Sequence, residues 1–473
     1  MKTKLFKSVL LLHTLLLCCM YCLAQDMPVL STQQAIRKLE SDIPRLMKVS
    51  NVPGLSVALI RNGKMVWHKG FGVMNAASKQ PVSDKTVFEA NSLSKPVFAY
   101  AVLTLVDEGK LNLDTPLFRY MDRDDRRSDD ARFNLITSRM ILSNSSGIIR
   151  SKTDPENKVD LAFAPGEKFE YSPTGFQLLS KVVEKITALK IEDFIRQRVL
   201  QPMGMNSSSY VWQPAYDTLR AYSHNWLAQP KADLNKPIHG AACCSLQTTP
   251  EDYARFVIGV MTGQLLQTAT WNEMLKSQIK VSDKFPTLFW GLGWGLEKSA
   301  SSEAFWHWGD GGVSKDYIKA DLKSKNAVVF FANSENGQMF TREILDDALG
   351  GQHPGYSWLN YQRYDSPDWL LLNDILANGA EKALQKKTNN NLTEAQMNQV
   401  GYQLLSIQKI DDAIRVFKQN TDNFPKSGNV WDSLAEAYMD KGDKATAIAY
   451  YQKSLELDPT NTNAVQMIQK LKQ

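Results

Sequence analysis

Ser92 and Lys95 have the residue types and spacing needed for covalent catalysis. They lie three positions apart at a predicted helix start, before an apolar run that includes Val97, Phe98 and Val102. Three residues is about one helical turn, so the Lys95 amine can stand beside the Ser92 hydroxyl and take its proton. The free N–H groups of a helix start favour the resulting negative charge. The alternative is a serine that caps the helix, followed by a surface lysine.

The same spacing occurs at Ser277/Lys280 and at Ser406/Lys409. Both of these serines lie inside predicted helical patterns, and Ser406 lies within a repeat. Only Ser92 stands at a helix start, so the sequence favours Ser92 as the nucleophile.

Tyr171 is the second candidate, in a loop before another helical run. A tyrosine whose pKa is lowered by nearby cations can shuttle a proton between nucleophile and leaving group. The alternative is a packed loop aromatic, the ordinary role for one of 16 tyrosines.

His307, Gly309 and Asp310 form the third piece, on a predicted strand. The small residues after His307 let a substrate backbone lie against the strand edge. The backbone N–H of Asp310 can then join that of Ser92 in an oxyanion hole. The alternative is a histidine packed between its two neighbouring tryptophans.

Together these pieces resemble the serine β-lactamase and penicillin-binding-protein superfamily, in its class C and esterase-like branch. That branch is recognised by Ser-x-x-Lys, Tyr-x-Asn and a Lys- or His-x-Gly strand, in this chain order. Further stretches within about residues 35–350 are similar to the same branch: 136–147 (ITSRMILSNSSG), 201–205 (QPMGM), 248–256 (TTPEDYARF), 291–297 (GLGWGLE) and 330–337 (FFANSENG).

The resemblance implies an exported serine hydrolase with esterase, D-peptidase or β-lactamase activity on a small-molecule or peptide substrate. Ser92 would attack a carbonyl and become acylated, while Lys95 and Tyr171 accept and return the proton. His307 would assist Tyr171 or bind a substrate carboxylate, and water would release the acyl group. No metal or organic cofactor is expected.

Two positions depart from the pattern of the branch. Pro173 stands where Tyr-x-Asn has its asparagine, so Lys95 must be held by other groups and recognition of a β-lactam is in doubt. Cys243 and Cys244 stand where relatives usually have two glycines. Cysteine is small and apolar, so packing is the expected role, and adjacent cysteines rarely form a disulfide.

The pattern of strands and helices predicts how these residues are positioned. An Asn-Gly pair between 55–60 and 65–72 indicates a hairpin, and 304–309, 317–322 and 327–333 indicate further strands. Between the hairpin and these later strands lie helical patterns at 94–109, 174–188, 191–199 and 250–263. We therefore expect an α/β (α+β) fold over residues 25–360, with an antiparallel sheet flanked by helices and an inserted helical lobe.

Residues 366–473 have an all-helical pattern that resembles tetratricopeptide repeats. Gly401, Ala413, Phe417 and Pro425 recur 34 residues later as a second set: Ala435, Ala447, Tyr451 and Pro459. Flanking helices are expected at 373–386 and 461–471. The repeats predict a groove for a peptide or protein partner, or else helices that only pack on the first domain or on a second copy.

Composition and charge limit the other possibilities. The 473 residues are 43% hydrophobic and carry a formal charge of +5, of which three charges belong to a basic leader. No basic patch appears, so nucleic acid is not an expected partner. Histidine and cysteine do not cluster at ligand spacing, so no metal site is expected.

Residues 1–24 are expected to be a signal peptide, with a basic start, an apolar run and cleavage near Ala24. A retained anchor is the alternative, and no later stretch is expected to span a membrane. The expected location is therefore periplasmic or secreted. Besides a hydrolase, the sequence leaves open an inactive protein of the same fold that acts through its repeats, and an acyltransferase.

Overall fold

The structure, a computed structural model, describes residues 28–122, 128–154, 158–299, 302–386 and 392–473. The chain divides into two compact units, residues 1–361 and 362–473. The expected signal peptide lies outside the described residues. Among the described residues, no helix combines the length and the hydropathy that crossing a bilayer requires.

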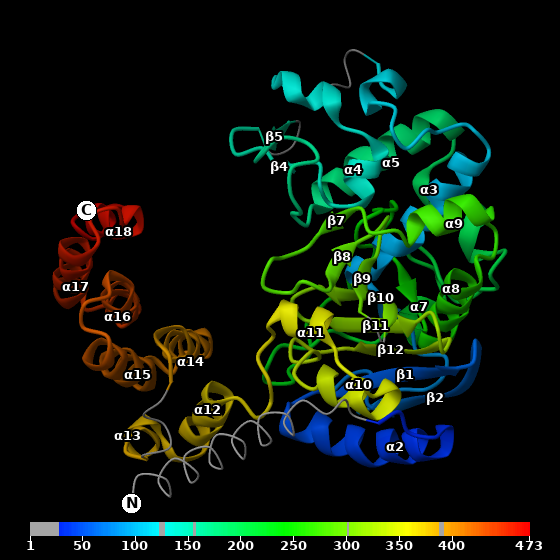
Figure 1. Ribbon diagram of the computed structural model, residues 1–473. Coiled ribbons are helices and arrows are strands. Elements are labelled where there is room, and N and C mark those ends of the chain that lie inside the picture. The colour runs from blue at the N-terminus through cyan, green and yellow to red at the C-terminus, as the bar shows by residue number, and fades with distance from the viewer. Residues whose placement is uncertain (1–27, 123–127, 155–157, 300–301, 387–391) are drawn as a thin grey trace, which may run out of the picture. The chain divides into compact units, whose positions relative to one another are not determined.

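An antiparallel eight-stranded sheet forms the centre of the first unit (Figure 1). Its strand order is β2-β1-β12-β11-β10-β9-β8-β7, so strands from both ends of the unit meet in the middle, as predicted. The strands are β1 (Gly54–Arg61), β2 (Lys64–Gly72), β7 (Ile279–Lys280), β8 (Leu288–Trp290), β9 (Gly295–Lys298), β10 (Glu303–Asp310), β11 (Lys315–Asp321) and β12 (Asn326–Ala332).

The predicted Asn-Gly hairpin joins β1 and β2. Asn62 and Gly63 have φ angles of 51° and 74°, the left-handed pair that a tight two-residue turn requires. Residues of β1 pair with β2 on one side and with β12 on the other, and every residue of β1 is buried. This strand is buried on both faces because helices cover both faces of the sheet.

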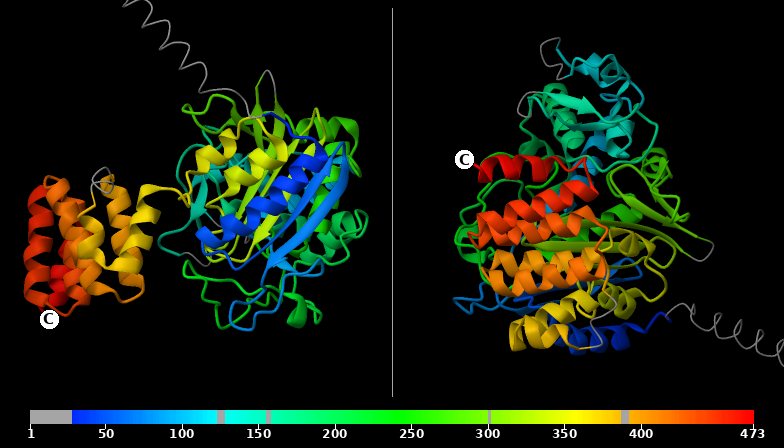
Figure 2. Two further views of the ribbon diagram at one scale, coloured as in Figure 1. Left: turned by 90° about the horizontal axis from the view of Figure 1, so that it is seen from below. Right: turned by 90° about the vertical axis from the view of Figure 1, so that its left-hand side faces the viewer.

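Helices α2 (Thr32–Val49) and α10 (Thr341–Leu349) pack together against β2 and β12, while α8 (Pro250–Thr262) packs on β1 and β12 (Figure 2). A capping box at Ser31 and Gln34 starts α2. Short helices complete this part of the unit: α7 (Tyr216–Leu219), α9 (Thr268–Met274) and α11 (Pro354–Leu359).

The helical lobe is inserted between β2 and β7. Its main helices are α3 (Ser94–Asp107), α4 (Ser138–Leu142), α5 (Pro173–Thr187) and α6 (Ile191–Ile195), and α6 continues as one π turn, Arg196–Leu200. Two small sheets pair β3 (Phe88–Glu89) with β6 (Gln247–Thr248) and β4 (Ile148–Arg150) with β5 (Val159–Leu161). The α+β architecture is therefore confirmed. The helix predicted at 191–199 is α-helical in its first half and π-helical in its second.

The second unit is helical throughout its described residues. Its helices are α12 (Pro367–Asn378), α13 (Ala380–Leu384), α14 (Glu394–Ser406), α15 (Ile410–Asn423), α16 (Gly428–Asp440), α17 (Lys444–Leu457) and α18 (Thr462–Leu471). The helix expected over 373–386 is instead two helices separated at Gly379, where φ is 81°. A Cβ added at Gly401 would lie 2.4 Å from the ring of Phe417, so this small residue lets α14 and α15 approach closely, as the repeat pattern predicted.

Candidate active site

Ser92 lies in a tight helical turn, Asn91–Leu93, that leads directly into α3. Asn91 has a φ of 46°, a left-handed conformation that turns the chain sharply just before the serine. The Asn91 side chain holds this turn by donating to Asp316 Oδ2 at 2.9 Å and to Ser314 Oγ at 3.1 Å. Asn91 was not predicted from the sequence, because its partners are more than 220 positions away along the chain.

Lys95 stands one turn after Ser92, with its side chain turned inward. Its Nζ lies 3.0 Å from Ser92 Oγ and 2.9 Å from the carbonyl oxygen of Cys243, and the residue is 1% exposed. Burial overturns the alternative of a surface lysine. The Cys243 carbonyl gives Lys95 the polar partner that Pro173, which has no polar side chain, cannot provide. The sequence did not predict this contact, since every residue has a backbone carbonyl.

The other two Ser-x-x-Lys pairs lie elsewhere. Ser277 lies between α9 and β7 and not in a helix, so that expectation was wrong. Ser406 ends α14 in the second unit, as the repeat pattern indicated.

Tyr171 is held between two anchored neighbours. The backbone N–H of Ser172 donates to Asn144 Oδ1 at 3.0 Å, and that of Glu170 donates to the Asn144 carbonyl at 2.8 Å. Ser172 also caps α5, and Pro173 occupies the first position of that helix, where a missing N–H is harmless. The Tyr171 ring lies beneath Lys95, with Nζ 4.8 Å from its centroid. The structure thus gives Asn144 a positioning role that the sequence alone did not assign.

His307 lies on β10 beside Tyr171, with ring centroids 6.0 Å apart, and it is fully buried. Its Nδ1 lies 2.8 Å from the carbonyl oxygen of Trp308, so Nδ1 carries the proton and Nε2 presents a lone pair. Burial and the charge of Lys95 lower the pKa of His307 to about 3. A neutral imidazole cannot attract a substrate carboxylate as a cation, so the geometry favours the other predicted role, assistance to Tyr171.

Among the buried polar atoms that have no partner within the described residues are the Tyr171 hydroxyl and His307 Nε2. An unpartnered buried polar group is costly, and natural structures keep such groups mainly where a substrate or water will use them. These two atoms therefore have hydrogen-bonding capacity left for a substrate or a water molecule.

Gly309 and Asp310 bring the end of β10 against the nucleophile turn. A Cβ added at Gly309 would lie 2.8 Å from the Ala90 carbonyl oxygen, so only glycine permits this approach. Burial raises the pKa of Asp310, but hydrogen bonds from Lys315 and Tyr361 outweigh it and hold that pKa below its usual range. Lys315 thus neutralises the Asp310 carboxylate. The backbone N–H of Asp310 remains the group predicted for the oxyanion hole.

Half-buried aromatic rings form a wall beside Tyr171. No sequence signal predicted this wall. The ring of Trp308 lies 4.8 Å from that of Tyr171 and 6.0 Å from that of Trp358, which in turn lies 5.9 Å from Phe169. These rings come from three segments distant in sequence, so only the fold brings them together. They offer an apolar surface to a substrate.

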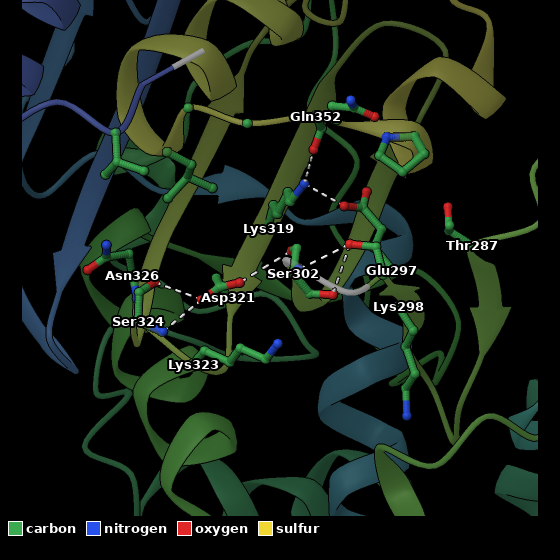
Figure 3. A pocket seen from close by; sticks show the side chains of 16 residues that line it. Thr287, Glu297, Lys298, Ser302, Lys319, Asp321, Lys323, Ser324, Asn326 and Gln352 are labelled. Carbon is green, nitrogen blue, oxygen red and sulfur yellow. Dashed lines mark hydrogen bonds and ion pairs between the residues drawn. The ribbon is translucent and has the colours of Figure 1, made fainter. Parts of the chain in front are cut away.

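A separate pocket of about 610 Å³ lies where β10 begins and β11 ends (Figure 3). Its lining includes Glu297, Lys298, Lys319 and Asp321, and none of the predicted site residues. Ser92, Lys95, Tyr171 and His307 therefore form a distinct site. The described residues contain no cluster of three or more metal-ligating side chains.

Known proteins share this fold and parts of this sequence. The family model for beta-lactamase matches residues 39–352, and that for the tetratricopeptide repeat matches residues 428–461. Among solved structures, the octameric penicillin-binding protein homologue from Pyrococcus abyssi superposes with a TM-score of 0.56 at 23% identity, covering 72% of this chain and 82% of that one. D-alanine carboxypeptidase AmpC from Burkholderia cenocepacia superposes with a TM-score of 0.57 at 17% identity, covering 67% and 99%.

Two curated relatives match over shorter stretches. Protein flp of Staphylococcus aureus (strain NCTC 8325) is 26% identical over 195 residues, which is 38% of this chain and 39% of that protein. Esterase EstB of Burkholderia gladioli is 25% identical over 201 residues, 37% of this chain and 51% of that protein. The family match spans well over half of the chain, in the unit that holds Ser92, Lys95, Tyr171 and His307. The chain therefore belongs to the beta-lactamase family, with a tetratricopeptide repeat in its second unit.

Proposed function

We propose that this protein is an exported serine hydrolase that cleaves an ester or amide through an acyl-serine intermediate. The observation that carries the proposal is the pairing of Ser92 Oγ with Lys95 Nζ at 3.0 Å in a site that excludes water from the lysine. Both acceptors of Lys95 among the described residues, Ser92 Oγ and the Cys243 carbonyl, are uncharged.

In the proposed reaction, Lys95 in its neutral form takes the proton of the Ser92 hydroxyl while the Ser92 oxygen attacks the substrate carbonyl. The N–H groups of Ser92 and Asp310 stabilise the oxyanion. Tyr171, with the lone pair of His307 beside it, passes a proton to the leaving group. Water then attacks the acyl-serine, and the same groups act in reverse.

The substrate we propose is an ester or peptide with an apolar group. The aromatic wall of Phe169, Trp308 and Trp358 supports an apolar group, and similarity to an esterase supports ester cleavage. Pro173 offers neither a side-chain amide nor a backbone N–H, so a β-lactam side chain lacks the donor that an asparagine would give it.

Labelling with a fluorophosphonate probe tests this function. We expect the probe to modify the wild-type protein at Ser92, located by mass spectrometry, and to leave a Ser92→Ala variant unmodified. Absence of label on the wild type, or label on a different serine, would contradict the proposal. A panel of p-nitrophenyl esters, a D-Ala-D-Ala peptide and nitrocefin should then show faster turnover of the esters or the peptide than of nitrocefin.

Export is the second part of the proposal. It rests on the basic and apolar character of residues 1–24. Protein recovered from the periplasm or the medium is expected to begin at Gln25 on N-terminal sequencing. A chain that begins at Met1 and stays with the membrane fraction would instead indicate a retained anchor.

A further inference from the structure

Cys243 and Cys244 form a dithiol pair next to the catalytic lysine. Their sulfur atoms lie 3.1 Å apart, and both cysteines are free. Cys243 is 6% exposed, whereas Cys244 is exposed. Packing therefore explains Cys243 but leaves Cys244 unexplained, because an exposed thiol contributes little to a core.

The turn that carries the pair is firmly held. Backbone N–H groups of Cys244 and Ser245 donate to the Ala241 carbonyl at 3.1 and 3.2 Å. The Ser245 hydroxyl also donates to the carbonyl of Tyr210 at 2.8 Å. The two thiols are thus presented side by side from a fixed backbone.

The peptide bond between the two cysteines contacts Lys95 directly. Its carbonyl oxygen, that of Cys243, accepts the 2.9 Å hydrogen bond from Lys95 Nζ. A disulfide between adjacent cysteines closes a ring that includes this same peptide bond. Closure therefore cannot occur without constraining the carbonyl that orients the lysine.

We propose that Cys243 and Cys244 are a thiol-modification site at which a small-molecule disulfide closes a reversible vicinal disulfide and thereby slows acylation of Ser92. The exposed Cys244 sulfur attacks the small disulfide, its S–S bond breaks and one thiol leaves. Cys243 then attacks the mixed disulfide, forms the S–S bond to Cys244 and releases the second thiol. The two protons of the protein thiols end on the two released thiols, so the protein is oxidised and the small disulfide is reduced.

The surroundings favour the second step. The hydrogen bond between the two sulfur atoms, together with the charge of Lys95, lowers the pKa of Cys243 to about 7 despite its burial, whereas the same hydrogen bond and burial raise the pKa of Cys244. A thiol with a pKa near ambient pH is an effective displacing nucleophile. The sulfur atoms must approach from 3.1 Å to a bonded distance of about 2.05 Å, and the ring that then forms includes the peptide whose carbonyl accepts from Lys95.

The regulation rests on the proposed hydrolase function, whereas closure of the disulfide does not. The experiment treats the full chain with dithiodipyridine and measures thiopyridone release, then the rate of Ser92 labelling by the fluorophosphonate. Because the first 24 residues contain three more cysteines, the control is a Cys243→Ser/Cys244→Ser double variant. We expect the wild type to release two more equivalents than this variant, and peptide mass spectrometry to show a linked pair without thiol adducts.

The rate of Ser92 labelling is expected to fall at least tenfold in the oxidised wild type and to recover with dithiothreitol. A Cys244→Ser variant should label at the wild-type rate before and after the oxidant. A closed disulfide with an unchanged labelling rate would overturn the regulation, and mixed disulfides or unreacted thiols at both positions would overturn the closure. Absence of Ser92 label from reduced wild-type protein would overturn the proposed function itself, and the thiol count would still report on closure.

Discussion

Two lysines of the first unit are buried almost equally but have opposite surroundings. Lys95 is 1% exposed and Lys319 is 4% exposed. Lys319, on β11, pairs with the Glu297 carboxylate and contacts the Gln352 carbonyl at 2.8 Å (Figure 3). It also lies 3.1 Å from His353 Nδ1. Within the described residues, the hydrogen-bond partners of Lys95 are a hydroxyl and a carbonyl, and the Tyr171 ring lies beside its amine.

The difference between these partners separates a lysine that stabilises the fold from one that contacts the proposed nucleophile. A buried ammonium with a carboxylate and two further acceptors has its charge and its hydrogen bonds satisfied by the fold. The two hydrogen-bond partners of Lys95 among the described residues are uncharged, and one of them is the Ser92 hydroxyl. Burial alone therefore does not distinguish the two lysines, whereas their hydrogen-bond partners do.

Replacing Lys95 should give the largest effect on reactivity. Lys95→Met keeps the length of the side chain but removes the proton acceptor, so acylation of Ser92 should slow by about 10²- to 10⁴-fold. The measurement is the rate of fluorophosphonate labelling, with circular dichroism to verify the fold. Wild-type labelling of a folded Lys95→Met protein would remove Lys95 from the mechanism.

Replacing Lys319 should reduce stability instead of reactivity. Lys319→Met leaves the Glu297 carboxylate buried without its cation, which should cost about 3–5 kcal/mol of unfolding free energy. Urea unfolding measures this loss, and the folded fraction should still label at Ser92 at the wild-type rate.

The double variant Lys319→Met/Glu297→Gln serves as the matched control for this pair. It removes both charges, so it should recover part of the lost stability. Equal stability of Lys319→Met and wild type would show that the ion pair at this end of the sheet is not structural.

Asp347 is a third buried ionisable group of the first unit, and its effect on stability depends on pH. Burial raises the pKa of Asp347 to about 7, although Lys38 lies 3.9 Å away and opposes the shift. Because the folded pKa exceeds the unfolded value, the native state binds the extra proton, and stability falls as pH rises from about 4 to 7.

Asp347→Asn removes this loss. The variant should gain up to about 4 kcal/mol over the wild type at pH 8 and nothing at pH 4. Thermal unfolding across this pH range measures the difference. A gain that is the same at both pH values would show that ionisation of Asp347 is not its cause.

Local sequence patterns were sufficient for much of the fold. The Asn62-Gly63 hairpin, the strands near 304–332 and the helix after Ser92 follow from short-range signals, and the structure contains each of them. Two helix predictions were wrong. Gly379 divides the helix expected over 373–386, and the segment that holds Ser277 is not helical.

The sequence by itself determined that Ser92 and Lys95 lie side by side, because they are neighbours on one helical turn and their contact is local. Only the tertiary structure decided what surrounds them. The Cys243 carbonyl, the support of Asn144 and Asn91, and the neutral state of His307 depend on segments far apart in the chain. Contacts of that kind arise from the packing of sheet against lobe, which no short window of residues encodes.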